Sequence, residues 1–306
     1  MPVVLATFAW IGDVCPFRPR LRCSGFRLRM ILRCSDLLCV AFPVCLGAVP
    51  EDVRVRALAA GRADEDAVSL VPGSFEVGYV AEDGSAHRLA LTDTWAVRFE
   101  AVAPVRRFYS RKAQRHLPGR WWSATDGVHV GYESWLERDH LIAMDFDQAV
   151  VGIASQPFWL FWIAEDGKVR SHAPDYFARR VDGSAVVVDC RPVGRRPPRD
   201  VAAFEATRRA CGLLGWEYRL VGAPDAVTTA NLRWLAGYRH QGHNIPALSA
   251  ALLAVFGEPA LMAGAYRVGD AIGVLPVLFH LLWRHDLQAD LSVPLHPWVT
   301  VTTAVV

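Results

Sequence analysis

Short apolar runs separated by turn residues open the regularly patterned part of the chain. Strand-like runs cover residues 75–80, 87–91 and 95–102, and the turn sequence Glu82-Asp-Gly-Ser85 separates the first two. Runs of this length bounded by Gly and Asp are typical of β-strands joined by tight turns. Residues 51–104 are therefore predicted to form a small β-rich segment.

The middle of the chain changes between the helical and the strand period. Leu136, Leu141 and Met144 recur at helical spacing and predict a helix over residues 131–148. Strand-like runs follow at residues 158–164, 169–172, 176–180 and 185–190, and after them come a helix from Asp200 toward Gly212, a strand at 216–221 and a helix at 226–238. The order of helix, three antiparallel strands, helix, strand and helix predicts an α/β core with a mixed sheet whose first helix crosses the sheet face.

The last part of the chain follows a linker at residues 240–246 and has a third pattern. Helical stretches are predicted near residues 246–256, 259–266 and 272–286, followed by β-like runs at 289–293 and 298–303. Three helices followed by a β-ribbon are typical of a winged helix, which serves either as a DNA reader or as a protein-docking module. The pattern leaves both uses open.

The length and composition allow a central domain with flanking parts, because 306 residues with 52% hydrophobic content can bury a large core. The organisation that we predict is an uncertain extension at residues 1–50, a β-rich segment at 51–104, a core at 105–240 and a winged-helix-like domain at 246–306. The extension holds five of the seven cysteines without a Cys-x-x-Cys pair, and its uncharged part is too short and proline-broken to span a bilayer. We interpret it as a poorly ordered or mis-assigned start.

The two remaining cysteines indicate the compartment. Cys190 and Cys211 fall in a predicted strand and a predicted helix, where buried thiols are common. Cysteine usage of this kind is typical of a reducing environment, so we expect a cytoplasmic protein without a membrane partner.

Positive charge gathers in one segment. The formal net charge of the chain is only +2, so no global field recruits nucleic acid. Residues 104–125, in contrast, contain no acid and interleave cations with aromatic side chains. The cations predicted to contact DNA phosphates are Arg106, Arg107, Arg111, Lys112, Arg115 and Arg120. A solvated basic loop anchored by its tryptophans is the alternative.

Two acids lie at the ends of a predicted hairpin. Asp175 opens one strand and Asp189 closes the next, so the turn at residues 182–183 brings both to the same end of the sheet. Glu137 on the crossing helix is the candidate third oxygen ligand, and the carbonyl of Cys190 is the fourth. Hard oxygen ligands suit Mg²⁺, with Mn²⁺ as a substitute, and such an ion can activate a water for phosphodiester hydrolysis.

Each of these acids also has a structural explanation. Ser134-x-x-Glu137 is a capping box, in which Glu137 satisfies a free amide at the helix start, and Glu133 is then the reserve ligand. Asp175 follows a proline and can simply start a strand or a turn. Asp189 either reaches solvent or binds a partner, because an unpaired buried carboxylate costs on the order of several kcal/mol.

Several stretches of the chain together resemble a known family. The pair Pro174-Asp175 followed by Asp189-Cys190-Arg191, after a helical glutamate, resembles the PD-(D/E)xK nuclease pattern. The stretches YESWLERDHLIAMDFD, SQPFWLFW, HAPDYFAR, VVVDCRPV and NLRWLAGYRH, in that order, resemble the TnsA-like endonuclease subunits of heteromeric transposases. The resemblance covers roughly residues 105–303 and leaves the first hundred residues outside.

The resemblance implies a Mg²⁺-dependent DNA endonuclease that cuts the 5′ ends of a mobile element. A separate integrase-fold transposase cuts the 3′ ends, an AAA+ ATPase is the expected regulator, and double-stranded DNA at the ends of the element is the substrate. By match to the motif of the family, Glu137, Asp175 and Asp189 would be the catalytic metal ligands. Arg191 falls on the lysine of the family, and Gln156 is an expected neighbour of the site.

Arg191 is a departure from the lysine of the family. A guanidinium stays protonated at any accessible pH, so Arg191 can position groups and stabilise charge but cannot deprotonate a water. The departure leaves a non-catalytic scaffold, which binds DNA or docks a transposase, as the main alternative. A housekeeping nuclease of the same superfamily, which would cut without a partner, is the second alternative.

Overall fold

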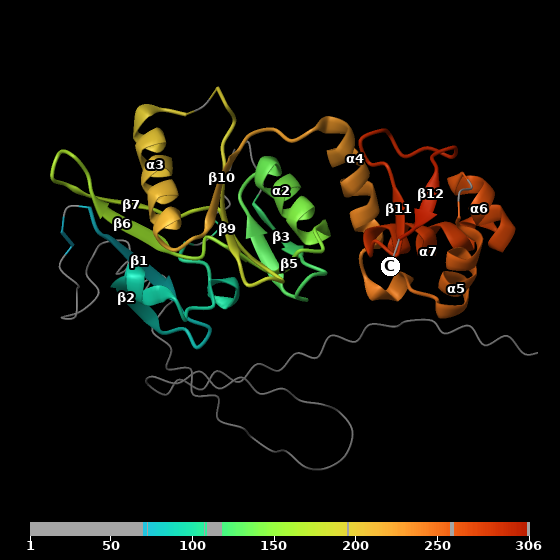
Figure 1. Cartoon of the computed structure of the whole chain (residues 1–306), viewed down its shortest axis with the longest axis horizontal. Coiled ribbons are helices and arrows are strands. Elements are labelled where there is room, and N and C mark those ends of the chain that lie inside the picture. Colours follow the sequence, from blue (N-terminus) through green and yellow to red (C-terminus); the bar gives the residue numbers. More distant parts are fainter. Residues whose placement is uncertain are drawn as a thin grey trace, which may run out of the picture. The chain divides into compact units, whose positions relative to one another are not determined.

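The structure, a computed structural model, describes residues 70–71, 73–106, 108, 118–194, 196–257 and 260–304. Within this part the chain is mixed α/β, with four β-sheets and six α-helices (Figure 1), which confirms the predicted class. The uncertain extension at residues 1–50 lies outside the described residues, as do residues 107 and 109–117 of the basic segment. In the described ranges, no helix is both long and apolar enough to cross a membrane.

A four-stranded sheet forms the centre of the fold. Its strands are β5 (Val150–Ser155), β8 (Tyr176–Arg180), β9 (Ala185–Cys190) and β10 (Glu217–Val221), in the order β10-β9-β8-β5. The neighbours β5, β8 and β9 are antiparallel, whereas β10 runs parallel to β9. All six residues of β9 are buried, which explains its continuous apolar run, since a strand covered on both faces does not alternate.

Two helices cover opposite faces of this sheet (Figure 1): α2 (Trp135–Phe146) and α3 (Pro198–Leu213). Successive residues of a strand point to opposite faces. Val186 and Val188 therefore join a cluster with Leu141 of α2, whereas Val187 joins a cluster with Ala206 of α3. The sheet is thus enclosed on both sides, and its strand ends are the places where polar groups can gather.

A second sheet lies beside the first and corrects the predicted topology. It consists of β1 (Phe75–Val80), β2 (Ala86–Ala90), β6 (Trp159–Ile163) and β7 (Val169–His172), in the order β2-β1-β6-β7. The runs at 158–164 and 169–172 were expected in the core sheet, but β6 pairs instead with β1. The third antiparallel strand of the central sheet is β5, for which the sequence pattern predicts no strand.

The prediction of a strand at residues 95–102 is wrong. The chain makes one 3₁₀ turn just before this range, η1 (Leu91–Thr94), and a second one inside it, η2 (Phe99–Ala101). Phe99 is fully buried, and its ring lies 5.0 Å from that of Phe158 and 5.6 Å from that of Phe177. Burial of this ring between the two sheets outweighs the local strand preference, because β-propensity depends mainly on packing.

A small ribbon precedes helix α2, formed by β3 (Gly119–Trp122) and β4 (His129–Tyr132). Buried Asp145 of α2 accepts hydrogen bonds from Trp121 Nε1 at 2.8 Å, Ser123 Oγ at 3.0 Å and the amide of Thr125 at 2.9 Å. A buried carboxylate with this many donors is satisfied without a metal ion, so Asp145 fixes the ribbon to the helix.

The C-terminal part is helical and ends in a ribbon. It contains α4 (Ala226–Leu235), η3 (Ala236–Tyr238), η4 (Gln241–His243), α5 (Pro246–Val255), α6 (Leu261–Val268), α7 (Ala271–Trp283), β11 (Leu287–Ala289) and β12 (Val301–Thr303). The three predicted helices and the antiparallel ribbon are confirmed, although the first ribbon strand precedes the predicted run at 289–293. Ile142 of α2 belongs to the same buried cluster as Leu235 and Leu278, so these helices pack on the core.

Candidate functional site

The register of two strands brings Asp175 and Asp189 to one end of the central sheet. Tyr176 of β8 pairs with Val188 of β9, so one step further along the hairpin Asp175 stands opposite Asp189. The connecting turn contains Gly183 at φ +84°, a backbone conformation that glycine adopts without a Cβ clash. Opposed residues of an antiparallel pair lie within about 5.5 Å at Cβ, so the two carboxyl groups are neighbours.

Asp175 lies in a crowded electrostatic position. Its carboxylate accepts a hydrogen bond of 2.7 Å from the backbone amide of Cys190, and the residue is half-buried. Burial, followed by the negative charges of Asp189 and Glu137, holds the pKa of Asp175 well above its usual range. The charge of Arg191 opposes this rise only weakly. Asp175 therefore lies within electrostatic reach of both other predicted ligands.

Asp189 is 1% exposed and already has two side-chain partners. His172 Nε2 lies 2.9 Å and 3.1 Å from its two carboxylate oxygens, and the hydroxyl of Tyr218 donates to Oδ2 at 2.7 Å. Burial and the charge of Asp189 raise the pKa of Tyr218, so its hydroxyl remains a donor. Neither partner is predicted by the sequence pattern. His172 could have been noticed in the HAPD stretch, whereas the sequence around Tyr218 carries no such signal.

Glu137 forms the capping box at the start of α2. Its oxygens accept hydrogen bonds from the amide of Glu133 at 2.7 Å and from Ser134 Oγ at 2.8 Å, while Ser134 Oγ accepts from the amide of Glu137 at 3.2 Å. Burial raises the pKa of Glu137, and the two hydrogen bonds act in the opposite direction. Because the helix begins at Trp135, the reserve ligand Glu133 lies before the helix instead of on it.

We expect the Ser134→Ala substitution to destabilise the protein by about 1 kcal/mol, because it removes the side chain that caps α2. Urea unfolding of the full chain measures the loss. Ser171→Ala, at an exposed position of β7, is the matched control and should change the free energy of unfolding by less than about 0.5 kcal/mol. Equal effects of the two substitutions would show that the cap contributes nothing specific.

Arg106 connects the basic segment to the acids. Its guanidinium Nη2 lies 3.0 Å from Glu133 Oε2, and its positive charge counteracts the rise in the pKa of Glu137. The Gln156 amide, turned to suit both groups, donates to the Arg106 carbonyl at 3.2 Å and accepts from the guanidinium at 3.0 Å. Arg106 was predicted as a DNA contact, and the structure places it next to the acid site with 38% of its side chain exposed.

Gln156 lies beside Asp175, in agreement with its predicted place near the site. The backbone amide of Gln156 donates to the backbone carbonyl of Asp175 at 2.8 Å, and the residue is 1% exposed. Its φ of +47° is uncommon for a residue with a side chain, and Pro157 follows it directly. Such strain persists only where the surroundings hold the residue in place, and it gathers at functional sites.

Arg191 and Cys190 follow Asp189 along the chain. Arg191 is exposed, and its Nε lies 3.9 Å from Asp200 in the first turn of α3, so it stands near the acids without binding either one. The Cys190 side chain is buried in the cluster that α2 covers, and burial raises the pKa of its thiol far above the usual range. The thiol is thus a packing group, and only its backbone is available to the site.

The other predicted DNA contacts divide into two sets. Arg120 lies on β3 and is exposed. The remaining four, Arg107, Arg111, Lys112 and Arg115, lie outside the described residues.

The donor set at this strand end suits a hard cation but is not preassembled. Over the described ranges, no group of three or more His, Cys, Asp or Glu side chains is arranged to hold a metal ion. Asp189 is held by its two partners and Glu137 by the cap. Asp175, however, is surrounded by like charge, and carboxylate oxygens in such surroundings are the preferred ligands of Mg²⁺ and Mn²⁺. The acids therefore fit the ion, provided that Glu137 leaves its capping position.

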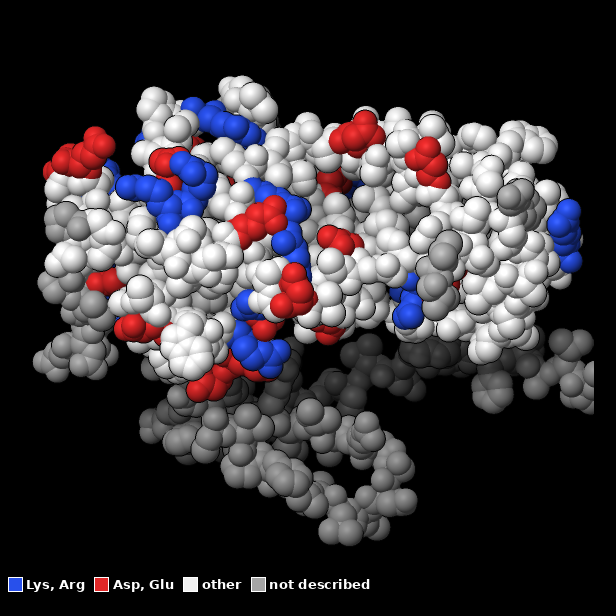
Figure 2. Space-filling model, viewed as in Figure 1, with Lys and Arg blue, Asp and Glu red and all other residues white. Residues whose placement is uncertain are grey.

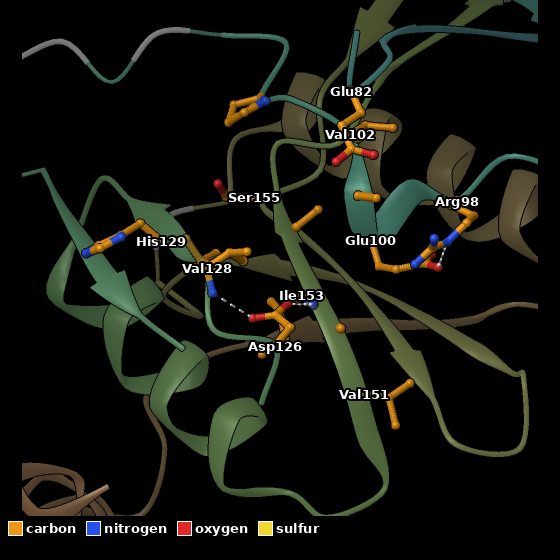
Figure 3. A pocket seen from close by; sticks show the side chains of 15 residues that line it. Glu82, Arg98, Glu100, Val102, Asp126, Val128, His129, Val151, Ile153 and Ser155 are labelled. Carbon is orange, nitrogen blue, oxygen red and sulfur yellow. Dashed lines mark hydrogen bonds and ion pairs between the residues drawn. The ribbon is translucent and has the colours of Figure 1, made fainter. Parts of the chain in front are cut away.

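A cavity of about 360 Å³ lies along the edge strand β5 (Figure 3). Asp126 points toward β5 there and accepts a hydrogen bond of 3.1 Å from the amide of Ile153. Glu82 and Glu100 also line the cavity, whereas none of the three predicted metal ligands does. A phosphodiester would meet three carboxylates and, among the described residues that line the cavity, only one arginine, Arg98, which is already paired with Glu100 at 3.2 Å, so this cavity is a poor candidate for DNA.

Comparison with known proteins adds no assignment. No protein-family model matches the chain, and no curated protein is similar enough to match it.

Proposed function

We propose that the chain is a metal-dependent DNA endonuclease with a restriction-endonuclease-like core at residues 105–240. The observation that carries the proposal is the register of β8 on β9, in which Tyr176 pairs with Val188, because its extension by one residue sets Asp175 opposite Asp189. The order α2-β5-β8-β9-α3-β10, with β10 parallel to β9 and a helix on each face, supports a PD-(D/E)xK core. Residues 51–104 would then extend this core, since β1 pairs with β6.

Asp175, Asp189, Glu137 and the carbonyl of Cys190 would hold the ion, Mg²⁺ or its substitute Mn²⁺. When bound, such an ion supplies positive charge for the scissile phosphate and lowers the pKa of the attacking water. Arg191 and Arg106 would stabilise negative charge on the phosphate, because both guanidinium groups stay protonated and positively charged. Gln156 and Glu133 orient Arg106 for this role.

The resemblance to TnsA-like subunits leads to a narrower proposal. The chain would cut the 5′ ends of a mobile element in the cytoplasm. It would be inactive alone and would become active together with an integrase-fold transposase, and an AAA+ ATPase would regulate the pair. The stretches that carry the resemblance include both acid-bearing ends of the hairpin, with Asp175 in one and Asp189 in the other. They also include the Gln156 segment, which contacts Asp175 through its backbone.

The winged-helix-like domain at residues 246–306 is better suited to docking a protein than to reading DNA. Its cations are Arg267 and Arg284, it has no lysine, and α7 is apolar along most of its length. On the face shown in Figure 2, Lys and Arg lie mainly over the sheets and α3, and few lie over these C-terminal helices. Phosphate contacts require Lys or Arg, so this domain would bind the transposase subunit.

Strand-specific cleavage tests the proposal. The full chain, mixed with its partner transposase, DNA carrying the ends of the element and Mg²⁺, should produce 5′-end cuts that disappear with chelator. Asp189→Asn should bind the same DNA without cutting it. Cutting by the chain alone would favour the housekeeping nuclease over the transposase subunit.

DNA affinity should fall steeply with salt, because the basic segment supplies the binding energy. Six cations that each neutralise one phosphate give a slope of about −5 in log affinity against log salt, or a loss of about 10³ between 50 and 200 mM. Titration of labelled duplex at several salt concentrations measures the slope. Salt-insensitive binding would count against the basic segment as the DNA contact.

A scaffold without catalysis remains the second candidate. The observation that favours it is the exposed Arg191 in place of a lysine. A scaffold would bind DNA and the transposase with the expected salt dependence, and Mg²⁺ would produce no cuts from wild type or from Asp189→Asn.

A further inference from the structure

The pair His172 and Tyr218 binds Asp189 but has no part in the metal and DNA contacts proposed above. His172 is the last residue of β7 in the second sheet, whereas Tyr218 lies on β10 of the central sheet. Both side chains contact the carboxylate of Asp189 on β9, at distances of 2.7 to 3.1 Å.

We propose that His172 and Tyr218 are positioning residues that fix the carboxylate of Asp189 in the orientation in which it and Asp175 bind a divalent cation. The inference rests on the proposed function. Hydrogen bonds to a ligating carboxylate hold it in one orientation, and removal of such partners commonly costs about 10- to 100-fold in metal affinity.

The hydrogen-bonding capacity of Asp189 leaves room for an ion. His172 Nε2 faces only the two carboxylate oxygens, which assigns the ring hydrogen to this nitrogen, and the Tyr218 hydroxyl supplies a second hydrogen. An ionised carboxylate accepts at about four lone-pair positions. Two donors therefore fix the group in place without using all its lone pairs.

The segment between β7 and β8 links His172 to the positions of both acids. Only Ala173 and Pro174, both buried, separate His172 from Asp175, so one short stretch orients Asp189 and supplies the acid opposite to it. The His172 ring also packs edge-on against Phe204 of α3, with the ring centroids 5.6 Å apart. The position of His172 is thus set by packing, and the hydrogen bonds to Asp189 follow from it.

Calorimetric titration of Mn²⁺ into the full chain tests the inference. Tyr218→Phe removes only the hydroxyl, and His172→Leu removes the ring donor; each should weaken Mn²⁺ binding by about 10-fold or more. His172→Gln keeps an N–H donor at similar reach and should bind within about threefold of wild type. Tyr266→Phe, on the exposed side of α6, is the control and should bind as wild type does. Thermal unfolding confirms that each variant is folded at the titration temperature.

The outcomes separate this inference from the proposed function. One outcome is that the wild type binds Mn²⁺ and Asp175→Ala loses this binding, while the folded variants Tyr218→Phe and His172→Leu bind Mn²⁺ as tightly as the wild type or more tightly. This result would overturn the positioning role but support the metal site. Equal weakening by His172→Gln and His172→Leu would also overturn it, since the donor would then be irrelevant. If the wild type binds no Mn²⁺, either with or without duplex DNA, both the positioning role and the proposed metal-dependent function are contradicted.

Discussion

The Asp175→Asn variant should lose DNA cleavage by a factor of about 10³ or more while becoming more stable than the wild type. Loss of a metal ligand removes several kcal/mol of transition-state stabilisation, which corresponds to this factor. The gain in stability follows from the raised pKa of Asp175, since asparagine is neutral and its amide oxygen can still accept from the amide of Cys190. Urea unfolding at pH 7 and the cleavage assay measure the two effects.

The pH dependence gives this prediction its control. A carboxyl whose pKa is higher in the folded state than in the unfolded state binds more protons when folded, so stability decreases as pH rises above about 4. The stability advantage of Asp175→Asn should therefore shrink as the pH falls toward 4. An advantage that stays constant with pH, or a less stable variant at pH 7, would show that like charge does not crowd this carboxyl.

Phe99→Ala should destabilise the chain by about 3–5 kcal/mol, the range typical for removal of a buried aromatic ring. Phe99 is fully buried, and its ring makes edge contacts with Tyr79 of β1, with Trp216 before β10 and with Phe158 before β6. The side chain thus joins both sheets. A loss of this size is a large part of the 5–15 kcal/mol that stabilises a typical domain.

Trp95→Ala is the matched control for Phe99→Ala. Trp95 lies four residues earlier in the same segment and is 83% exposed, so its removal should change the free energy of unfolding by less than about 0.5 kcal/mol. Urea unfolding of both variants, followed by tryptophan fluorescence and by circular dichroism, measures the difference. A small effect of Phe99→Ala would mean that the two sheets are stable without this aromatic contact.

Local sequence patterns predicted the elements better than their pairing. The run at Phe75–Val80 and the helices after Pro198 appear in the structure because turn residues, proline and apolar period act over a few neighbours. The pairing of β6 with β1 joins residues more than eighty positions apart, and nothing in either run selects the other. Strand β5 has Gly152 at its centre and no alternation, so its neighbours in space, not its own residues, make it a strand.

In the candidate site, too, the local features are visible in the sequence and the long-range contacts are not. The hairpin that sets Asp175 opposite Asp189 is local, and its turn residues are visible in the sequence. The partners of Asp189 come from β7 and β10, whose positions depend on the whole packing of α3 and the two sheets. Glu137 could be read both as a cap and as a ligand, and the structure shows the cap.

The buried thiol of Cys190 turns the end of β9 into a natural reporter of local opening. The backbone amide of Cys190 donates to Asp175, and the residue before it is Asp189. The sulfur is buried in the cluster that includes Leu141 of α2, so a reagent reaches it when this strand end separates from the helix. Alkylation kinetics at this cysteine would then give the free energy of that opening. Burial raises the pKa of Cys211 to about 12, and the alkylation rate of this thiol would report in the same way on the opening of α3 on the opposite face.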